Sequence, residues 1–215
     1  MKVDASYGED HVLPDGTRLH LRMIRPSDGD ALRQGFAELS PASRYRRFLS
    51  GTASLSDEAV RYLTECDGVN HVAIVATTDS HDLKSEVGLG VARFIRLPEE
   101  PEVAEAAVTV IDRAQGKGIG RLLLQALAEA ARERSIRTIR GEVLASNAPM
   151  RRLLHELGAG VRSDDGSTLV FDVPLEWRRG EGEPMSEREK EHPLRRLLRA
   201  AAESIAALRG GILPG

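Results

Sequence analysis

Three glycines at alternating positions form a group that could hold a phosphate. The segment Gly116-Lys117-Gly118-Ile119-Gly120 lets backbone N–H groups converge without obstruction from Cβ atoms. An amphipathic pattern follows directly, so the free N–H groups at a helix N-terminus would lie at this loop. Such a place suits a phosphate or pyrophosphate, and Lys117 and Arg121 add positive charge. The alternative interpretation is a plain turn from a strand into a helix.

Two common phosphate motifs do not fit this loop. A P-loop requires G-x-x-x-x-G-K-[ST], whereas here Gly118 follows Gly116-Lys117. A dinucleotide fingerprint requires G-x-G-x-x-G, but Arg121 or Leu123 stands where the third glycine belongs. The sequence therefore indicates a phosphate ligand of another kind.

The second chemical candidate is Glu105, which stands among apolar residues in the segment 104–108. Burial there would raise the pKa of the carboxyl group and make it a better proton acceptor. Such a carboxylate could take a proton from a substrate. The alternative is a glutamate on the exposed side of a strand. Glu99, Glu100 and Glu102 lie in or near a turn and are poorer candidates.

The elements that must position these residues can be predicted from periodicity. Val108, Thr109, Val110 and Ile111 favour a strand. Apolar residues then recur at 119, 122, 123, 126, 127 and 130, the spacing of an amphipathic helix. The order is strand, glycine loop, helix.

The rest of the chain alternates between strand and helix patterns. Residues 1–12 resemble a loose leader. We expect strands at 17–24, 71–78, 86–97, 138–144, 159–163 and 167–173, and helices from Ser27 or Asp28, from Pro41, at 56–66 and at 147–158. Gly88 and Gly90 either weaken their strand or mark a bulge.

Composition excludes several classes of function. The chain has 215 residues, a net charge of -3, 41% hydrophobic and only 4% aromatic residues, so we expect no nucleic-acid or membrane partner. Its histidines form no close-spaced pair, so we expect no metal. Cys66 is the only cysteine; with no signal peptide recognised, this predicts a cytoplasmic protein. We interpret Cys66 as a small buried residue rather than a nucleophile.

Four motifs resemble those of a known family. Gln115, Gly118 and Gly120 match [QR]-x-x-G-x-[GA], which resembles the acyl-CoA motif of the GNAT family of N-acetyltransferases. The L-x-x-I-R-P-x-D at 21–28 and the N-x-x-M-x-x-L-x-x-x-L-G at 147–158 are similar to further parts of this family. The L-S-P-x-S-R-Y-x-R-F at 39–48 resembles the acetyltransferase domain of bacterial Pat-type protein lysine acetyltransferases. The resemblance covers about residues 13–174.

This resemblance implies an α/β domain at 13–174, with a mixed, mostly antiparallel sheet, helices on both faces and strands that splay where CoA enters. It implies acetyl-CoA as co-substrate and Glu105 as general base. The implied cofactor-binding residues are the strand residues Val108, Thr109 and Val110, the loop residues Gln115, Gly116, Lys117, Gly118, Ile119, Gly120 and Arg121, and Asn147. Asn147 has an equally good explanation as a helix N-cap. Many relatives place a tyrosine acid where this chain has Leu154.

The predicted function is acetyl-CoA-dependent acetylation of an amine, with a protein lysine as the first choice of acceptor. The alternatives are acetylation of a small amine and a non-catalytic acyl-CoA-binding module. Arg44, Arg46 and Arg47, beside Tyr45 and Phe48, would line an acceptor surface or form a solvated helix face. Residues 175–215 read as a linker followed by an amphipathic helix, which either packs on its own domain or contacts a second copy or a partner. The oligomeric state stays open.

Overall fold

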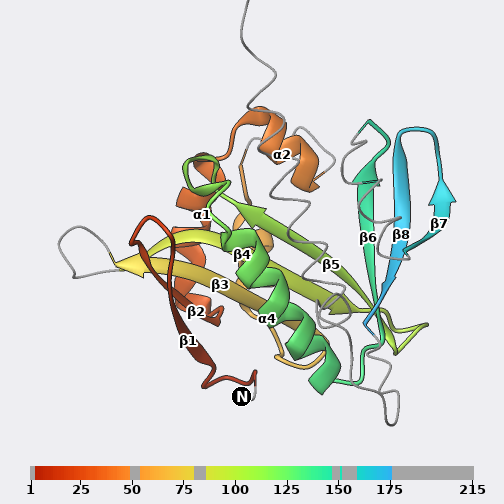
Figure 1. Ribbon diagram of the computed structural model, residues 1–215, viewed down its shortest axis with the longest axis horizontal. Coiled ribbons are helices and arrows are strands. Elements are labelled where there is room, and N and C mark those ends of the chain that lie inside the picture. Colours follow the sequence, from red (N-terminus) through yellow and green to blue (C-terminus); the bar gives the residue numbers. More distant parts are fainter. Residues whose placement is uncertain (1–2, 49–53, 80–85, 147–150, 152–158, 176–215) are drawn as a thin grey trace, which may run out of the picture.

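A single eight-stranded sheet runs through the protein, in the order β1-β2-β3-β4-β5-β6-β8-β7 (Figure 1). The computed structural model describes residues 3–48, 54–79, 86–146, 151 and 159–175. Within them β5 and β6 pair in parallel and the other neighbouring strands pair antiparallel. The strands are β1 (Gly8–Val12), β2 (Arg18–Met23), β3 (His71–Asp79), β4 (Glu86–Arg96), β5 (Val103–Val110), β6 (Thr138–Leu144), β7 (Gly160–Asp164) and β8 (Thr168–Pro174).

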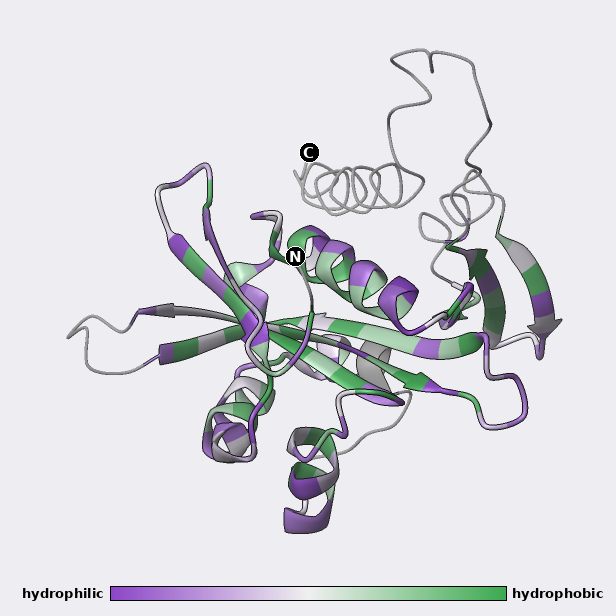
Figure 2. Ribbon diagram, turned by 90° about the horizontal axis from the view of Figure 1, so that it is seen from below, coloured by the Kyte–Doolittle hydropathy of each residue, from purple (hydrophilic) through white to green (hydrophobic). Residues whose placement is uncertain are grey.

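Helices cover both faces of this sheet, as the sequence predicts. The helix α4 (Ile119–Glu133) lies on one face, and the shorter helices α1 (Gly29–Ala37), α2 (Pro41–Phe48) and α3 (Asp57–Thr64) lie on the other (Figure 2). The predicted apolar stripe of α4 forms the main core, with Ile119, Leu123 and Leu127 almost fully buried against the sheet. Two 3-10 turns, η1 (Pro26–Asp28) and η2 (Asp112–Ala114), precede α1 and α4.

The first residues are not a loose leader, so that prediction is wrong. β1 pairs with β2 in the register Gly8↔Arg22. Val3 and Tyr7 are buried, with 1% and 6% of their surface exposed. The sequence does not indicate this strand, because its residues GEDHV are mostly polar and show no alternation of apolar and polar residues. It is held by its backbone ladder and by contacts such as the one between His20 Nδ1 and Asp10 Oδ1, at 2.7 Å.

Several local predictions are confirmed. The pairing of β3 with β4 shifts after Ala76, so Leu89 is an extra residue between Gly88 and Gly90 and forms a bulge. Ser56 caps α3, since its Oγ accepts a hydrogen bond from Ala59 N at 3.1 Å. That helix ends at Thr64, two residues before the predicted end. The predicted helix at 147–158 and the tail after residue 175 lie outside the described residues.

Candidate active site

The glycine loop adopts the arrangement expected of an anion-binding helix start. α4 begins at Ile119, and its N-cap is Gly118 with φ of 89°. Gly116 also has a positive φ, 77°, a conformation that favours glycine. A Cβ added at Gly118 would find no atom within 4 Å, so the space in front of the helix N-terminus is open. These residues fit a pyrophosphate, because the N–H groups of the first turn face an open surface.

The two basic residues of the loop differ in their surroundings. Lys117 Nζ lies 2.9 Å from Asp15 Oδ2, in the turn between β1 and β2. Hydrogen bonds from Thr17 and Lys117 hold the pKa of the Asp15 carboxyl well below its usual range. The positive charge of Lys117 is therefore partly offset by the Asp15 carboxylate. Arg121 lies exposed on the first turn of α4, where it can reach an anion at the loop.

Gln115 faces the protein rather than the loop surface. Its Nε2 donates to the carbonyl oxygen of Val110 and to Asp112 Oδ1, both at 2.9 Å. Its side-chain nitrogen is therefore occupied in fixing the turn between β5 and α4. A direct side-chain contact with the cofactor would have to use the remaining amide oxygen.

Asp112 is a residue of the site that sequence reasoning missed. Its Oδ2 accepts a hydrogen bond from Ser40 N at 2.9 Å, and its Oδ1 accepts one from the buried Ser43 Oγ at 2.7 Å. The same Oδ1 accepts from Gln115. Asp112 thus joins the start of α2 to the glycine loop. The only sequence signal was a polar break between the strand and the glycines.

The gap between β5 and β6 forms the second part of the site. Their parallel ladder has three residue pairs and ends at Glu105↔Arg140, although both strands continue. Figure 1 shows the strands diverging beyond this point. The expected splay of the sheet is therefore present.

Alternation along β5 decides which backbone groups face this gap. Ile111 N donates to Leu89 O, and Leu97 N donates to Val103 O, so the odd-numbered residues of β5 direct their N–H and C=O groups toward β4. The even-numbered residues direct theirs toward β6. Val108 therefore presents its backbone to the gap, while Thr109 is paired with Val91 of β4. Of the three strand residues that the resemblance implies for cofactor binding, Val108 has its backbone at the gap, and Thr109 directs its backbone toward β4. Val110 O is already used by Gln115.

Glu105 lies at the vertex of the gap, in the last residue pair before the strands separate. Its side chain is exposed, so the predicted burial among apolar neighbours is wrong. The reason is the alternation of a strand: Ala104 and Ala106 point toward α4, and Glu105 points to the opposite face. Among the described residues Glu105 has no ion-pair partner, because the neighbouring Arg140 binds Asp172 and Glu100, each at 2.7 Å.

The arginines of α2 do not all face an acceptor. Arg44 Nε donates to Leu39 O at 3.0 Å, and its guanidinium lies over the Phe36 ring at 4.8 Å from the centroid. Arg44 therefore ties α2 to the end of α1. The side chains of Tyr45, Arg46, Arg47 and Phe48, and the whole of Asn147 and Leu154, lie outside the description.

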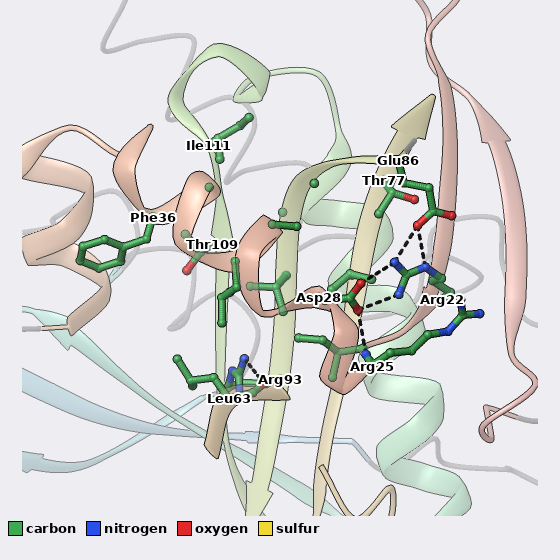
Figure 3. A pocket seen from close by; sticks show the side chains of 18 of the residues that line it. Arg22, Arg25, Asp28, Phe36, Leu63, Thr77, Glu86, Arg93, Thr109 and Ile111 are labelled. Atoms are coloured by element: carbon green, nitrogen blue, oxygen red, sulfur yellow. Dashed lines mark hydrogen bonds and ion pairs between the residues drawn. The ribbon is translucent and has the colours of Figure 1, made fainter. Parts of the chain in front are cut away.

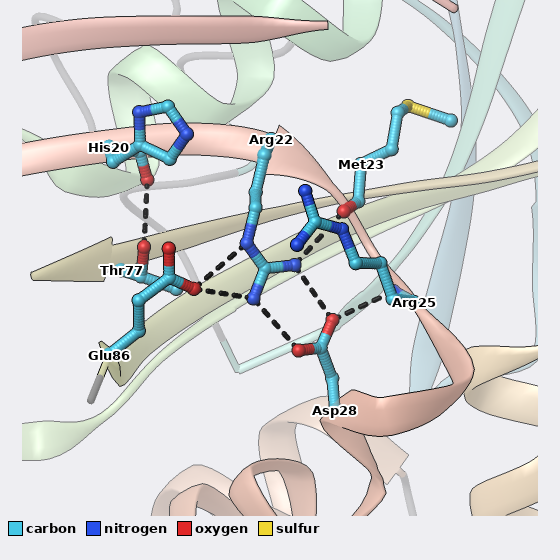
Figure 4. Close-up of polar contacts among 7 residues, drawn as sticks. All are labelled: His20, Arg22, Met23, Arg25, Asp28, Thr77 and Glu86. Carbon is cyan, nitrogen blue, oxygen red and sulfur yellow. Dashed lines mark hydrogen bonds and ion pairs between the residues drawn. The ribbon is translucent and has the colours of Figure 1, made fainter. Parts of the chain in front are cut away.

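A cavity of about 380 Å³ lies on the same sheet face as Glu105, between α1 and strands β2 to β5. Figure 3 shows Phe36, Thr109 and Ile111 on one side and a charged cluster on the other. In this cluster the buried Arg22 donates to Asp28 Oδ1 and Oδ2, both at 2.8 Å, and to Glu86 Oε2 (Figure 4). Burial opposes ionisation of Asp28, but hydrogen bonds from Arg22 and the Arg25 backbone prevail and lower its pKa.

The described part of the chain contains neither a cluster of metal-binding side chains nor a membrane-spanning helix. Over the ranges that the structure describes, no group of three or more histidines, cysteines, aspartates or glutamates could hold a metal ion. Within the same ranges, no helix has the length and apolar character needed to cross a bilayer.

The thiol of Cys66 has a raised pKa, and the main cause of this shift is burial of the side chain.

Comparison with known proteins points to one family. The model of the Acetyltransferase (GNAT) family matches residues 45–159. The chain is 34% identical over 160 residues to Acetyltransferase PA5475 of Pseudomonas aeruginosa, covering 74% of this chain and 84% of that protein. It is also 34% identical over 165 residues to the acetyltransferase Pat of Mycolicibacterium smegmatis, of which it spans 47%.

A solved structure agrees with the sequence matches. The GNAT domain of S. lividans PAT superimposes with a TM-score of 0.68 at 28% identity, over 78% of this chain and 96% of that domain. The chain belongs to the GNAT family of N-acetyltransferases.

Proposed function

We propose that this acetyltransferase transfers the acetyl group of acetyl-CoA to lysine side chains of proteins, with Glu105 as the general base. The observation that carries the proposal is the position of Glu105 at the vertex where β5 and β6 separate. There its carboxylate lies on the strand that also presents the Val108 backbone to the gap. A base and a hydrogen-bond donor therefore flank one opening.

The cofactor would lie along this opening. The pyrophosphate fits the N-terminus of α4 at Gly118, Ile119 and Gly120, with Arg121 nearby. The pantetheine arm would follow the unpaired edge of β5, where Val108 offers its N–H and C=O groups. The thioester carbonyl would accept a hydrogen bond from Val108 N–H, which stabilises the negative charge that develops on its oxygen.

Each step of the transfer then has a residue or a solvent molecule to perform it. Glu105 takes a proton from the ammonium group of the acceptor, directly or through a water molecule, because it is exposed to solvent. The free amine attacks the thioester carbon, the carbon–sulfur bond breaks, and the nitrogen loses its second proton to solvent or to the departing thiolate. The thiolate leaves without a dedicated acid, since a thiol has a pKa of only about 8.5.

Two observations support a protein lysine as acceptor. The relative from Mycolicibacterium smegmatis and the solved domain from S. lividans both carry the name Pat. The opening at Glu105 is exposed, so an acceptor residue on a protein surface can approach it.

The single cysteine agrees with a protein that acts in the cytoplasm.

The acceptor class is tested by thiol release from acetyl-CoA. The enzyme is incubated with lysine-containing peptides and folded proteins in one series and with small amines and polyamines in another. We expect release with the peptide series, with the acetyl group found on the lysine Nζ by mass spectrometry. Release with small amines alone would contradict the protein-lysine assignment, and release with neither series would contradict the enzymatic function.

A further inference from the structure

The cavity beneath α1 has no role in the transfer described above. It crosses four neighbouring strands, from Thr109 of β5, with Ile111 just beyond the end of that strand, to Arg22 of β2. Three spacings between adjacent strands amount to about 14 Å. Helix α1 forms its roof, through Ala31, Leu32, Gly35 and Phe36. A cavity of about 380 Å³ has the size of a small-molecule site.

The end of the cavity nearest β5 is mostly apolar, although the buried Arg93 also lines it and donates a hydrogen bond to Leu63 O. Phe36, Leu39 and Ile111 are each at most 6% exposed there, and Val91 lines the floor. At the opposite end lie Asp28 and Glu86, which both form ion pairs with Arg22. A ligand that enters beside Thr109 would therefore contact Val91, Phe36 and Ile111.

The path from the gap to the cavity runs over small side chains. Val108 presents its backbone to the gap, and its neighbours Ala107 and Thr109 are the β5 residues on the cavity face. Thr109 itself lines the cavity. A carbonyl carbon held at the Val108 backbone would thus lie beside Thr109, which lines the cavity, whereas Glu105 lies three residues away toward the vertex.

We infer that this cavity takes the hydrocarbon chain of longer acyl-CoA donors, so that the enzyme transfers straight-chain acyl groups beyond acetyl. This inference rests on the proposed function, because it places the thioester at Val108. The chemistry of the transfer is unchanged: the acyl carbon moves from sulfur to nitrogen, and CoA leaves as the thiolate. The substrate class is a neutral aliphatic acyl-CoA.

Gly35 offers a way to block the cavity. A Cβ at this position would lie 3.7 Å from Ile111 Cγ2, an ordinary contact, so Gly35→Ala fits. The larger side chain of Gly35→Leu would extend into the apolar end. Neither change demands an unusual backbone conformation, and both residues have higher helix propensity than glycine. Gln34→Leu is the matched control, because Gln34 is the exposed neighbour on α1 and does not line the cavity.

The experiment measures kcat/KM by thiol release with acetyl-, propionyl-, butyryl- and hexanoyl-CoA and one saturating amine acceptor. For the unmodified enzyme we expect hexanoyl transfer to be readily measurable. Gly35→Leu should lower the ratio of hexanoyl to acetyl transfer at least about tenfold, since one methylene in an apolar pocket already changes rates by that order. Gly35→Ala should give a smaller decrease, and Gln34→Leu none.

Several outcomes would overturn the inference. An unmodified enzyme that uses acetyl-CoA but no longer donor would refute it and leave the proposed function intact. A folded Gly35→Leu variant with an unchanged ratio of hexanoyl to acetyl transfer would also refute it. If no acyl-CoA supports transfer, the proposed function itself fails. The donor profile of the unmodified enzyme keeps the test valid even if Gly35→Leu does not fold.

Discussion

At the scale of single residues, Asp112 connects the two halves of the site. Its carboxylate accepts hydrogen bonds from Ser40 and Ser43 at the start of α2 and from Gln115 of the glycine loop. We expect Asp112→Ala to lower the free energy of unfolding by about 2 kcal/mol, because hydrogen bonds to a charged acceptor are lost and the buried Ser43 hydroxyl loses this partner.

The measurement for Asp112 is urea denaturation followed by circular dichroism. Ser43→Ala, which removes one of these bonds, should cost about half as much. The control is Arg113→Gln, on the same turn, which removes an ion pair with Glu38 at the surface. Equal stability of the Asp112→Ala and Arg113→Gln variants would show that Asp112 does not hold the turn.

A substitution at Gly118 tests whether the glycine loop binds the pyrophosphate of the cofactor. The space at its Cβ position is open, so Gly118→Glu would place a carboxylate where we expect the pyrophosphate. Like charges repel, and we expect acetyl-CoA binding to be abolished in calorimetric titration. Gly118→Ala is the control for backbone strain, since both variants must adopt φ of 89° at this residue. If Gly118→Glu folds and binds acetyl-CoA as tightly as Gly118→Ala does, the loop is not the phosphate site.

At the scale of elements, the close approach of β4 to β5 depends on Gly90. A Cβ there would lie 2.8 Å from Thr109 O, a backbone atom, and 3.1 Å from Leu123 Cδ1. We expect Gly90→Ala to destabilise the protein by about 1–3 kcal/mol through overpacking. Gly88 lies on the other side of the bulge with nothing within 4 Å of its Cβ position, so Gly88→Ala is the matched control and should change stability much less. Thermal denaturation gives the comparison, and similar losses in both variants would refute it.

The start of β3 contains a titratable contact. Arg93 Nη1 donates to His71 Nε2 at 3.0 Å, an arrangement that requires neutral histidine. Burial, followed by the positive charge of Arg93, lowers the pKa of His71. The unfolded chain therefore binds more protons than the folded one below about pH 6.5, and stability should fall as the pH decreases from there toward the folded pKa.

The variant His71→Phe tests this titration, because it keeps a ring next to Tyr62, whose centroid lies 5.1 Å away, but carries no titratable group. We expect the free energy of unfolding to depend less on pH in this variant than in the unmodified protein, over the range from about pH 7 to 5.5. The measurement is urea denaturation at each pH. The same slope in both proteins would exclude His71 as the cause.

At the scale of the whole molecule, the sequence predicted the α/β sheet, the α4 stripe and the glycine loop because their periodicities are strong and local. It missed β1, whose polar residues become a strand only by pairing with β2. It also treated Glu105 as buried, because apolar neighbours in sequence suggested desolvation, whereas neighbours in a strand point to opposite faces. The roles of Asp112 and Gln115 depend on hydrogen bonds to residues that no sequence pattern links.

The cavity beneath α1 could not be predicted for a similar reason. Its walls come from α1 and four strands that meet only in the folded sheet. The individual residues read as ordinary core positions in the sequence.

The central claim is that Glu105 is the base of an acetyl-CoA-dependent transfer to an amine. The most direct test is kcat of the Glu105→Gln variant with acetyl-CoA and a lysine peptide, with the acetyl-CoA dissociation constant measured in parallel. The exposed Glu102→Gln, on the preceding turn, serves as the control. We predict that Glu105→Gln lowers kcat on the order of 10²- to 10⁴-fold, the usual contribution of a general base. The dissociation constant and the activity of Glu102→Gln should stay as in the unmodified enzyme. A Glu105→Gln variant that retains full kcat would contradict the account.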